Sequence, residues 1–352
     1  MFLKQDDYLV LQQTNADATA GWGIPCRDMT VDEMKKLHEY CGINTVFEWA
    51  YWSMVEKSGQ YDWSIVDRKI DQCRKAGMRM IMATPISPPQ DLTNLDLYGR
   101  GLNGIEYRYL LSFWNPEAME YTRKFVQALL DRHAGPDINF MMGDLIMESY
   151  LWNAPVYLDR AATEAFRNRY DDDIRHHARG QVTVTKELRE FLRDGVIDYH
   201  LFIQDLLIGQ HNEIWDHSQW IIALQSQHNA VFARPDVYGA YRKRWPDVDI
   251  MMMASTYWKH GDQNAQRVND ILSMYDARIL VEAGYCEGLR NGTPDRAIKG
   301  GVYELTAEPD RWQGQVVGPI HPLGDGNREI EPWMYDIMKQ TVEKWRVAKE
   351  GA

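Results

Sequence analysis

The sequence predicts an α/β fold in which eight parallel strands and the helices between them form a (β/α)8 barrel, the TIM-barrel class. Short apolar runs alternate with amphipathic helical stretches along the chain, and this alternation is typical of a parallel sheet covered by helices. Most of the runs are apolar throughout, as expected of strands buried on both faces. No G-x-G-x-x-G follows any of them, which argues against a dinucleotide-binding doubly wound sheet.

The strands are predicted at residues 21–26, 44–49, 78–84, 139–148, 220–226, 248–255, 278–283 and 315–320. Between these strands, the sequence contains residues that typically start and end helices. The first helix begins after Thr30, with Glu33 completing a capping box, and stops at Gly42. A second helix ends at Gly77, and a third spans 115–135, which opens with Asn-Pro, a cap followed by a first-turn proline.

Two connections are too long for simple barrel loops. Residues 85–113 follow the third strand, and residues 149–219, which contain several helical patterns, follow the fourth. Both begin at the carboxyl end of a strand, the face where barrel active sites lie, and long ordered insertions there usually wall a pocket. Without an internal repeat or a linker, we expect one domain over residues 1–352 with these two insertions.

The composition narrows the class of partner. A formal net charge of -12 argues against nucleic acid or an anionic membrane surface. No stretch approaches the roughly 20 apolar residues that span a bilayer, and the first residues do not resemble a signal peptide. The four cysteines form no C-x-x-C pair, so we expect a cytoplasmic protein without a metal site or cofactor. The 13 Trp and 19 Tyr suit the apolar faces of sugar rings, although a large core would use them equally well.

Two glutamates close apolar runs at equivalent points. Glu148 ends the fourth predicted strand and shares a face with Asp144, and Glu282 ends the seventh. Strands four and seven lie across the mouth of a barrel, so these carboxylates are predicted to face each other. A retaining glycosidase needs such a pair about 5–5.5 Å apart, one as acid and one as nucleophile. The alternative, for either residue alone, is a salt-bridged or exposed glutamate.

The stretch from 47 to 92 contains Trp-Ser, then Gly-x-Tyr-Asp-Trp-Ser, then Thr-Pro-x-x-x-Pro, in this order. It resembles the second and third βα units of clan A glycoside hydrolases, most closely the family 42 β-galactosidase barrel. Residues 115–148 also resemble that family's approach to its acid/base glutamate. The resemblance is good over about 42–148 and thin beyond. It implies that Glu148 is the acid/base and Glu282 the nucleophile.

One position departs from that pattern. Clan A members usually have Asn directly before the acid/base, where it hydrogen-bonds the sugar 2-hydroxyl, and this chain has Met147. Such bonds supply several kcal/mol in the transition state. Either another donor takes over, with Asn153 and Asn229 as candidates, or the substrate is unusual at C2, or activity is reduced.

Further substrate-binding candidates lie at or beyond strand ends. The resemblance places a nucleophile-binding tyrosine near Tyr257, and a plain structural role is as probable as a site role for each candidate. Tryptophans at strand ends, including Trp114, are candidates for stacking on sugars, and we expect half of them to belong to the core. The full set is Tyr257, Trp258, Asn153, Trp152, His228, Asn229, Trp52 and Trp49.

The remaining clusters of charged residues and histidines do not indicate another chemistry. The pair His176–His177 lacks a recurrent metal-ligand spacing, and the acidic run 171–173 reads as charge on a helix surface. We therefore expect a retaining hydrolase that acts on an oligo- or polysaccharide through two glutamates. The alternatives are a transglycosidase on the same barrel, a non-catalytic sugar-binding barrel, and a lyase or isomerase that uses one glutamate as base. The sugar, the linkage and the oligomeric state stay open.

Overall fold

The structure is a computed structural model. It describes residues 8–12, 29–86, 88–101, 106–142, 158–179, 183–211, 220–221, 235–246, 250–255, 273–274, 277–282 and 312–317, together with parts of 332–347.

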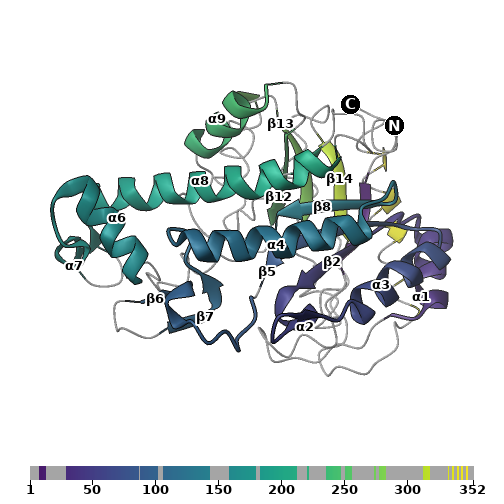
Figure 1. Cartoon of the computed structure of the whole chain (residues 1–352). Helices are drawn as coiled ribbons and strands as arrows, with labels where there is room; N and C mark the ends of the chain where they lie inside the picture. The colour runs from purple at the N-terminus through teal and green to yellow at the C-terminus, as the bar shows by residue number, and fades with distance from the viewer. Residues whose placement is uncertain are drawn as a thin grey trace.

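Eight strands form one sheet, in the order β11-β12-β13-β14-β1-β2-β5-β8, and every neighbouring pair in it is parallel. Apart from the starting point, this is the order of the strands along the chain. The two end strands, β8 and β11, also lie in contact with each other. Figure 1 shows the arrangement of the strands and helices. The α/β class predicted from the sequence is confirmed. The strands are β1 (Tyr8–Gln12), β2 (Thr45–Tyr51), β5 (Arg79–Ile86), β8 (Ile138–Met142), β11 (Trp220–Ile221), β12 (Ile250–Ser255), β13 (Ala277–Glu282) and β14 (Trp312–Val317).

The first strand differs from the prediction. β1 pairs with both β14 and β2, so Tyr8–Gln12 takes the place that the sequence assigned to residues 21–26, which lie outside the described part. This strand of five residues contains only three consecutive aliphatic residues, Leu9 to Leu11, between Tyr8 and Gln12. A run so short carries a weak periodicity signal, and pairing on both sides decides its conformation.

The first helix starts and ends as predicted. Thr30 is the N-cap of α1 (Val31–Lys36), and its hydroxyl accepts from the backbone N–H of Glu33 at 3.2 Å while the Glu33 carboxylate accepts from the Thr30 backbone at 2.8 Å. The helix continues as a π-helical turn, η1 (Leu37–Cys41), and stops at Gly42, whose φ of 77° is the left-handed conformation that glycine adopts freely.

Helices between the strands include α3 (Ser64–Lys75), α4 (Pro116–His133), α8 (Lys186–His211) and α9 (Pro235–Arg244). Of these, α3, α4 and α8 contact strands of the sheet, and α9 contacts α8. Asn115 caps α4, with Pro116 at its first position, as the sequence predicts. α4 and α8 run side by side (Figure 1). No helix in the described ranges is long and apolar enough to cross a membrane.

A buried ion pair fixes which face of the sheet meets α3. Glu48 on β2 and Lys69 on α3 lie 2.7 Å apart, with side chains only 2% and 5% exposed. Val46, two residues before Glu48, is fully buried, and Met82 pairs with Glu48 across the ladder to β5. These residues therefore share the face that the helices cover.

The Gly-Gln-Tyr-Asp-Trp-Ser segment builds the entry to α3. After the short helix α2 (Trp52–Val55), a hairpin forms from β3 (Glu56–Lys57) and β4 (Gln60–Tyr61). Its turn uses Ser58 and Gly59, with φ of 51° and 78°. Asp62 then accepts from the backbone N–H of Ser64 at 3.0 Å, at the start of α3. The motif thus makes a turn and a helix start.

Both long connections contain ordered elements. The first has the 3-10 turn η2 (Leu95–Leu97) and an antiparallel hairpin of β6 (Tyr98–Arg100) and β7 (Glu106–Leu111). The second contains α6 (Arg160–Tyr170), α7 (Ile174–His177) and a hairpin of β9 (Ala178–Arg179) and β10 (Thr183–Val184), before α8. In Figure 1, α6 and α7 lie at the end of α8 where that helix begins.

Candidate active site

Glu282 is the last residue of β13, at the carboxyl end of the strand. It pairs with Ser255, the last residue of β12, on one side and with Val316 of β14 on the other. The carboxyl ends of parallel strands meet at one edge of the sheet, where α/β proteins place their reacting groups. The sequence-based position of Glu282 at a strand end is thus its position in the structure.

The ladder also tells on which face Glu282 lies. Residues paired across a parallel ladder share a face, and Glu282 pairs with Val316, Val316 with Val10, and Val10 with Thr45. Thr45 is three residues from Glu48 on β2, so alternation puts the two on opposite faces. Since Glu48 lies on the face covered by α3, Glu282 lies on the face turned away from that helix.

Glu148 falls outside the described residues, together with its neighbours Asp144 and Met147. The structure describes the fourth strand of the chain order only as β8, Ile138–Met142, so the predicted strand over 139–148 is tested only up to Met142.

The two long connections pack against each other. The Ser112 hydroxyl, after β7, donates to Asp159 Oδ1 at 2.8 Å, and the Leu158 backbone N–H donates to the Arg100 carbonyl oxygen at 2.8 Å. Asp159 also caps α6 by accepting from the Ala162 backbone N–H at 2.9 Å. One side chain therefore joins the first connection to the start of the helices in the second. No sequence pattern had indicated Asp159.

Aromatic rings fill the space between α8 and the start of α4. Trp114 stacks on Phe191 of α8 with ring centroids 4.9 Å apart and an angle of 7°, and Phe113 lies against both Trp114 and Tyr199. Gly195 of α8 allows this approach, because an added Cβ would lie 2.6 Å from Trp114. Trp114 therefore belongs to the packing of the connections, as half of the strand-end tryptophans were expected to do.

Trp52 is part of the core, and the expectation that it stacks on a sugar is corrected. Its side chain is 2% exposed, and its ring stacks on Tyr121 at 5.3 Å and on Phe125 at 4.6 Å, both from α4. The indole N–H donates to Glu56 at 2.6 Å, and the Tyr121 hydroxyl donates to the same carboxylate. Both ring faces and the polar edge are thus used within the protein.

The remaining candidates are not placed. Trp49 lies in β2, in register with Ala83 of β5, and its side chain is not described. The others fall outside the described ranges: Tyr257, Trp258, Asn153, Trp152, His228 and Asn229.

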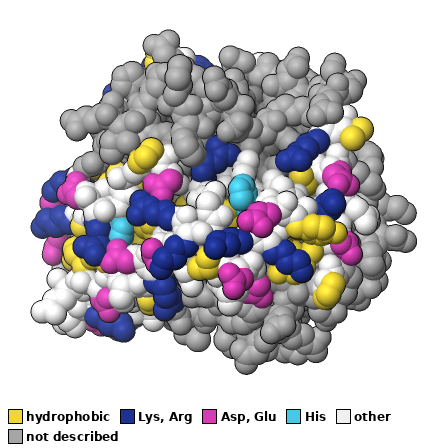
Figure 2. All heavy atoms as spheres, turned by 90° about the vertical axis from the view of Figure 1, so that its right-hand side faces the viewer, with side chains coloured by type: hydrophobic (Ala, Val, Ile, Leu, Met, Phe, Trp, Pro, Cys, Tyr) yellow, Lys and Arg dark blue, Asp and Glu magenta, His cyan; other side chains and the backbone are white. Residues whose placement is uncertain are grey.

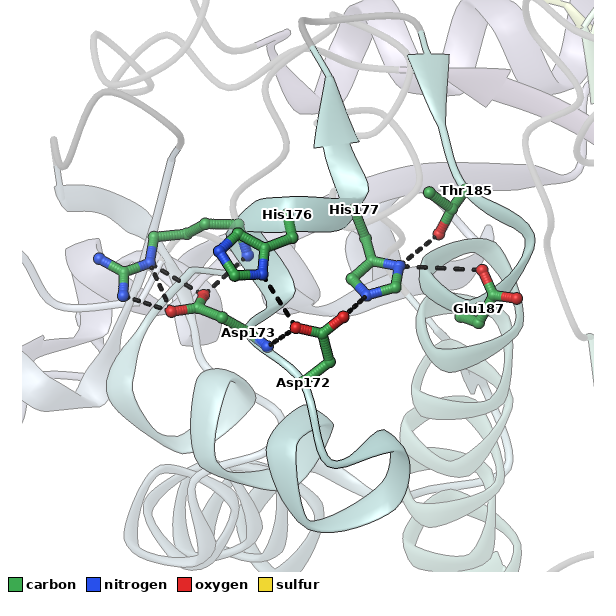
Figure 3. A network of polar contacts seen from close by, with 7 residues as sticks. Asp172, Asp173, His176, His177, Thr185 and Glu187 are labelled. Carbon is green, nitrogen blue, oxygen red and sulfur yellow. Dashed lines mark hydrogen bonds and ion pairs between the residues drawn. The ribbon is translucent and has the colours of Figure 1, made fainter.

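The acidic run 171–173 forms a turn, not a helix surface as expected. Asp171 has a left-handed φ of 53° and ends α6. Asp172 bonds His176 Nδ1 and His177 Nε2, both at 2.9 Å, and His177 Nδ1 lies 2.7 Å from the Thr185 hydroxyl just before α8 (Figure 3). Hydrogen bonds to the Asp172 carboxylate lower its pKa to about 2. The bond from His176 has the largest effect, and the bonds from the Asp173 backbone N–H and from His177 add to it.

This network ties α7 to the start of α8, and we assign it a structural role. Within the part of the chain that the structure describes, no group of three or more His, Cys, Asp or Glu side chains is arranged to hold a metal ion.

Acidic and basic side chains intermingle on the face that looks to the right in Figure 1. Figure 2 shows Lys and Arg beside Asp and Glu on its described part. Among the described residues, Arg74 pairs with Asp137, Arg132 with Asp67 and Arg123 with Glu120.

The comparisons with known proteins bear on the fold. No protein-family model matches the sequence, and no curated protein matches it. Among solved structures, the catalytic domain of a beta-amylase from Paenibacillus polymyxa is similar, with a TM-score of 0.57 and 12% sequence identity over 96% of this chain and 99% of that one. At this identity the likeness concerns the fold alone, and it extends over nearly the whole length of both chains. The resemblance to family 42 in particular is not confirmed by these comparisons.

Proposed function

We propose that this chain is a retaining glycoside hydrolase on a closed (β/α)8 barrel, with Glu282 as nucleophile and Glu148 as acid/base. The observation that carries the proposal is the place of Glu282, at the carboxyl end of β13 and on the face away from α3. The similarity in fold to a glycosidase catalytic domain supports it.

The order of the strands supports the proposed closure of the sheet. β1 pairs with both β2 and β14, the neighbours that the first strand of a barrel has. β8 and β11 lie in contact, and they follow each other in the chain with α8 between them. A ladder between them would complete the ring, and the face that carries Glu282 would then line the interior.

The proposed reaction has two steps. The Glu282 carboxylate attacks the anomeric carbon while Glu148 gives its proton to the leaving oxygen, which forms a glycosyl-enzyme ester. Glu148, now ionised, takes a proton from water as that water attacks the same carbon and releases Glu282. Charge and protons balance over the two steps, so no cofactor is required.

The role of Glu148 sets a condition on the chain after β8. Phe140 pairs with Met82, and Met82 with Glu48, so even-numbered residues of β8 lie on the helix-covered face. A regular strand continued to 148 would leave Glu148 on that face. The proposal therefore requires a bulge or bend between Met142 and Glu148, and Gly143 is suited to one.

The joined connections are proposed as one wall of the substrate cleft, because both start at the carboxyl edge and pack on each other through Ser112 and Asp159. The proposed ligand is an oligo- or polysaccharide. Side chains proposed to bind it are Tyr257, Trp258, Asn153, Trp152, His228, Asn229 and Trp49.

The test is turnover by purified protein. Aryl β-glycosides, intact polysaccharides and the substrate of the beta-amylase neighbour form the panel. Glu282→Gln is expected to abolish turnover of every active substrate, because nothing else forms the glycosyl-enzyme. Glu148→Gln is expected to spare aryl glycosides with good leaving groups, and azide should then accelerate their breakdown. Glu164→Gln, an exposed glutamate on α6 paired with Arg160, is the matched control.

The product decides among the alternatives. Retention of the anomeric configuration in the first-formed product supports double displacement, and inversion overturns it. Glycosyl transfer to an added sugar in preference to water would indicate a transglycosidase. Binding of oligosaccharides without turnover of any panel member would indicate a non-catalytic barrel. Full activity in both glutamate variants would place the chemistry on other residues.

A further inference from the structure

His133 is a buried histidine at the end of α4, and its ring packs against the start of α3. Its side chain is 5% exposed. The ring stands at 74° to that of Trp63, the N-cap of α3, with centroids 5.3 Å apart. Both helices contact β5, so His133 lies at a joint in the helix layer beside that strand.

The two ring nitrogens of His133 favour the neutral form. Nε2 is buried and, within the part of the chain that the structure describes, has no hydrogen-bond partner. Nδ1 lies 3.6 Å from Asp67 Oδ1, which is too long for a hydrogen bond. We assign the single proton of the neutral ring to Nδ1, because that nitrogen faces the carboxylate. A charged ring would also carry an N–H on Nε2, buried without an acceptor.

Burial is the largest influence on the pKa of His133 and lowers it to about 4. Among the charged side chains, Asp67 on α3 raises this pKa, whereas Arg132 on α4 and Arg74 on α3 lower it. Asp67 is already bound by Arg132, through hydrogen bonds of 2.6 Å and 3.1 Å. Arg74 is paired with Asp137. The one anion that attracts a charged His133 is therefore shared with a competing cation.

Two features of the site favour the charged ring. A histidine in the last turn of a helix gains from the negative end of the helix dipole, and a cation beside a tryptophan ring gains from its π-electrons. Neither one gives the buried Nε2 a hydrogen-bonding oxygen. The balance therefore favours a neutral ring in the folded protein.

We propose that His133 is an acid-sensitive switch at the contact of α3 with α4: uptake of a proton drives the ring out of its buried place and loosens that contact. The inference stands apart from the proposed function and uses a residue that no sequence pattern singled out. In the sequence, a histidine at the end of a helix looks like an exposed basic residue that complements the dipole.

Folded and unfolded chains take up this proton at different pH. The unfolded chain does so near the ordinary histidine pKa of 6.5, and the folded protein only near 4. Between these values the unfolded state binds the proton and the folded state does not, so stability falls as pH falls. Above 6.5 the penalty is absent, and below about 4 it no longer grows. Over this window the unfolding equilibrium constant should rise on the order of a hundredfold.

The first experiment is an NMR titration of protein labelled with 13C in its histidine rings, in which His133→Phe identifies the resonance of His133. At about pH 5.5, where a free histidine is mostly charged, this ring should still be neutral. Arg132→Gln should raise its titration midpoint, because it removes a cation and frees Asp67. Arg123→Gln breaks the comparable exposed pair with Glu120 on the same helix and should leave the midpoint unchanged.

The second experiment locates the opening by amide hydrogen exchange at pH 7 and pH 5, corrected for intrinsic exchange rates. In wild type, peptides from 63–75 and 125–138 should lose protection roughly tenfold or more at pH 5. In His133→Phe, which keeps a ring and does not titrate, they should stay protected. Peptides from 160–177 should change in neither protein. If His133→Phe does not fold, His133→Leu takes its place.

Three results would overturn the switch. A ring that is charged at about pH 5.5 in the folded protein would show that Asp67 and Trp63 stabilise the cation. Equal loss of protection at pH 5 in wild type and in the variant without the histidine would assign the acid sensitivity to another group. A loss spread evenly over all peptides would show unfolding of the whole protein in acid, without a separate opening between α3 and α4.

Discussion

Ser112 and Asp159 join two segments that lie 47 residues apart in the chain, through a hydrogen bond of 2.8 Å between the serine hydroxyl and the carboxylate. Both residues are buried, at 2% and 1% exposure. Burial raises the pKa of Asp159 above its ordinary value, even though the bonds from Ala162 and Ser112 favour the charged form. The folded protein therefore disfavours the ionised form of Asp159 relative to the same carboxylate in water.

This cost predicts a pH dependence. The folded protein holds the Asp159 proton to higher pH than the unfolded chain does, so the contribution of Asp159 to stability is fully present below the ordinary carboxyl pKa, about 3.9. It is lost as pH rises through the raised folded pKa. Asp159→Asn keeps the cap and does not titrate. The free energy of unfolding of the variant minus that of wild type should therefore increase with pH across this window.

The measurement is urea unfolding of both proteins from pH 3 upward. Taking the difference matters, because lowered pKa values at carboxylates such as Asp67, Asp137 and Asp172 give the whole protein the opposite trend. Those contributions cancel between variant and wild type. A difference that stays flat with pH would contradict the raised pKa of Asp159. Ser112→Ala should weaken the junction at every pH by about 1 kcal/mol.

The buried pair of Glu48 and Lys69 predicts a strong asymmetry between single and double variants. Lys69→Met leaves the Glu48 carboxylate buried without its cation, and we expect a loss of about 3–5 kcal/mol in the free energy of unfolding. Glu48→Leu combined with Lys69→Met removes both charges and should recover most of that loss. Urea unfolding of the three proteins tests this. Equal stability of the Lys69→Met variant and wild type would show that the pair is not buried.

Gly195 predicts an unusual response to alanine. In a helix interior, glycine to alanine normally stabilises by about 1 kcal/mol. Here the new Cβ would lie 2.6 Å from Trp114 and 2.8 Å from Phe113, and Trp114 is held by its stacking on Phe191. Overpacking costs about 1–3 kcal/mol, so we expect Gly195→Ala to be destabilising in thermal unfolding.

The control for Gly195→Ala replaces the large side chain that the new Cβ would meet. In a Trp114→Leu background the same Gly195→Ala change should become neutral or stabilising, because the smaller side chain leaves room for the Cβ. The double-mutant cycle, measured by thermal unfolding, then gives a coupling free energy between the two changes that is opposite in sign to the effect of Gly195→Ala alone. If alanine at 195 stabilises both backgrounds, the close approach of Trp114 to α8 is refuted.

Local sequence signals predicted most of the described fold. The capping box at Thr30 and the Asn-Pro start of α4 define helix boundaries through contacts within four residues, and both are found. Runs rich in aliphatic residues and Met also predicted strands over 248–255 and 278–283, close to β12 and β13, whereas β14 begins three residues before the predicted strand 315–320. β1 was missed because its three aliphatic residues become a strand only through pairing with β2 and β14, which no local pattern encodes.

Side-chain roles that depend on distant partners were not predictable in the same way. Trp52 follows a strand, which suggested a sugar platform, but Tyr121 and Phe125 from α4 enclose it. The acidic run 171–173 was predicted to lie on a helix surface, but it forms a turn in which Asp172 bonds His176 and His177. Glu282 could be placed at a strand end because strand ends are local features.

The last prediction concerns Met147, the residue before Glu148. A thioether accepts weakly and donates nothing, so it cannot replace an asparagine amide at a sugar 2-hydroxyl. If the site otherwise resembles clan A, the 2-hydroxyl contributes little here, and 2-deoxy glycosides should be handled comparatively well. A neutral hydrogen bond is worth about 0.5–1.5 kcal/mol, so the usual penalty for 2-deoxygenation should shrink severalfold. The measurement is kcat/KM for matched 2-hydroxy and 2-deoxy aryl glycosides.

Met147→Asn should then raise the preference for the 2-hydroxy substrate, because it supplies the missing donor. A strong preference already present in wild type would mean that another donor acts, and Asn153→Ala and Asn229→Ala would identify it by abolishing that preference. An unchanged preference in Met147→Asn, with wild-type thermal stability, would mean that residue 147 is not at the sugar. In that case Glu148, its direct neighbour, would lose its support as the acid/base, while the position of Glu282 at the end of β13 would be unaffected.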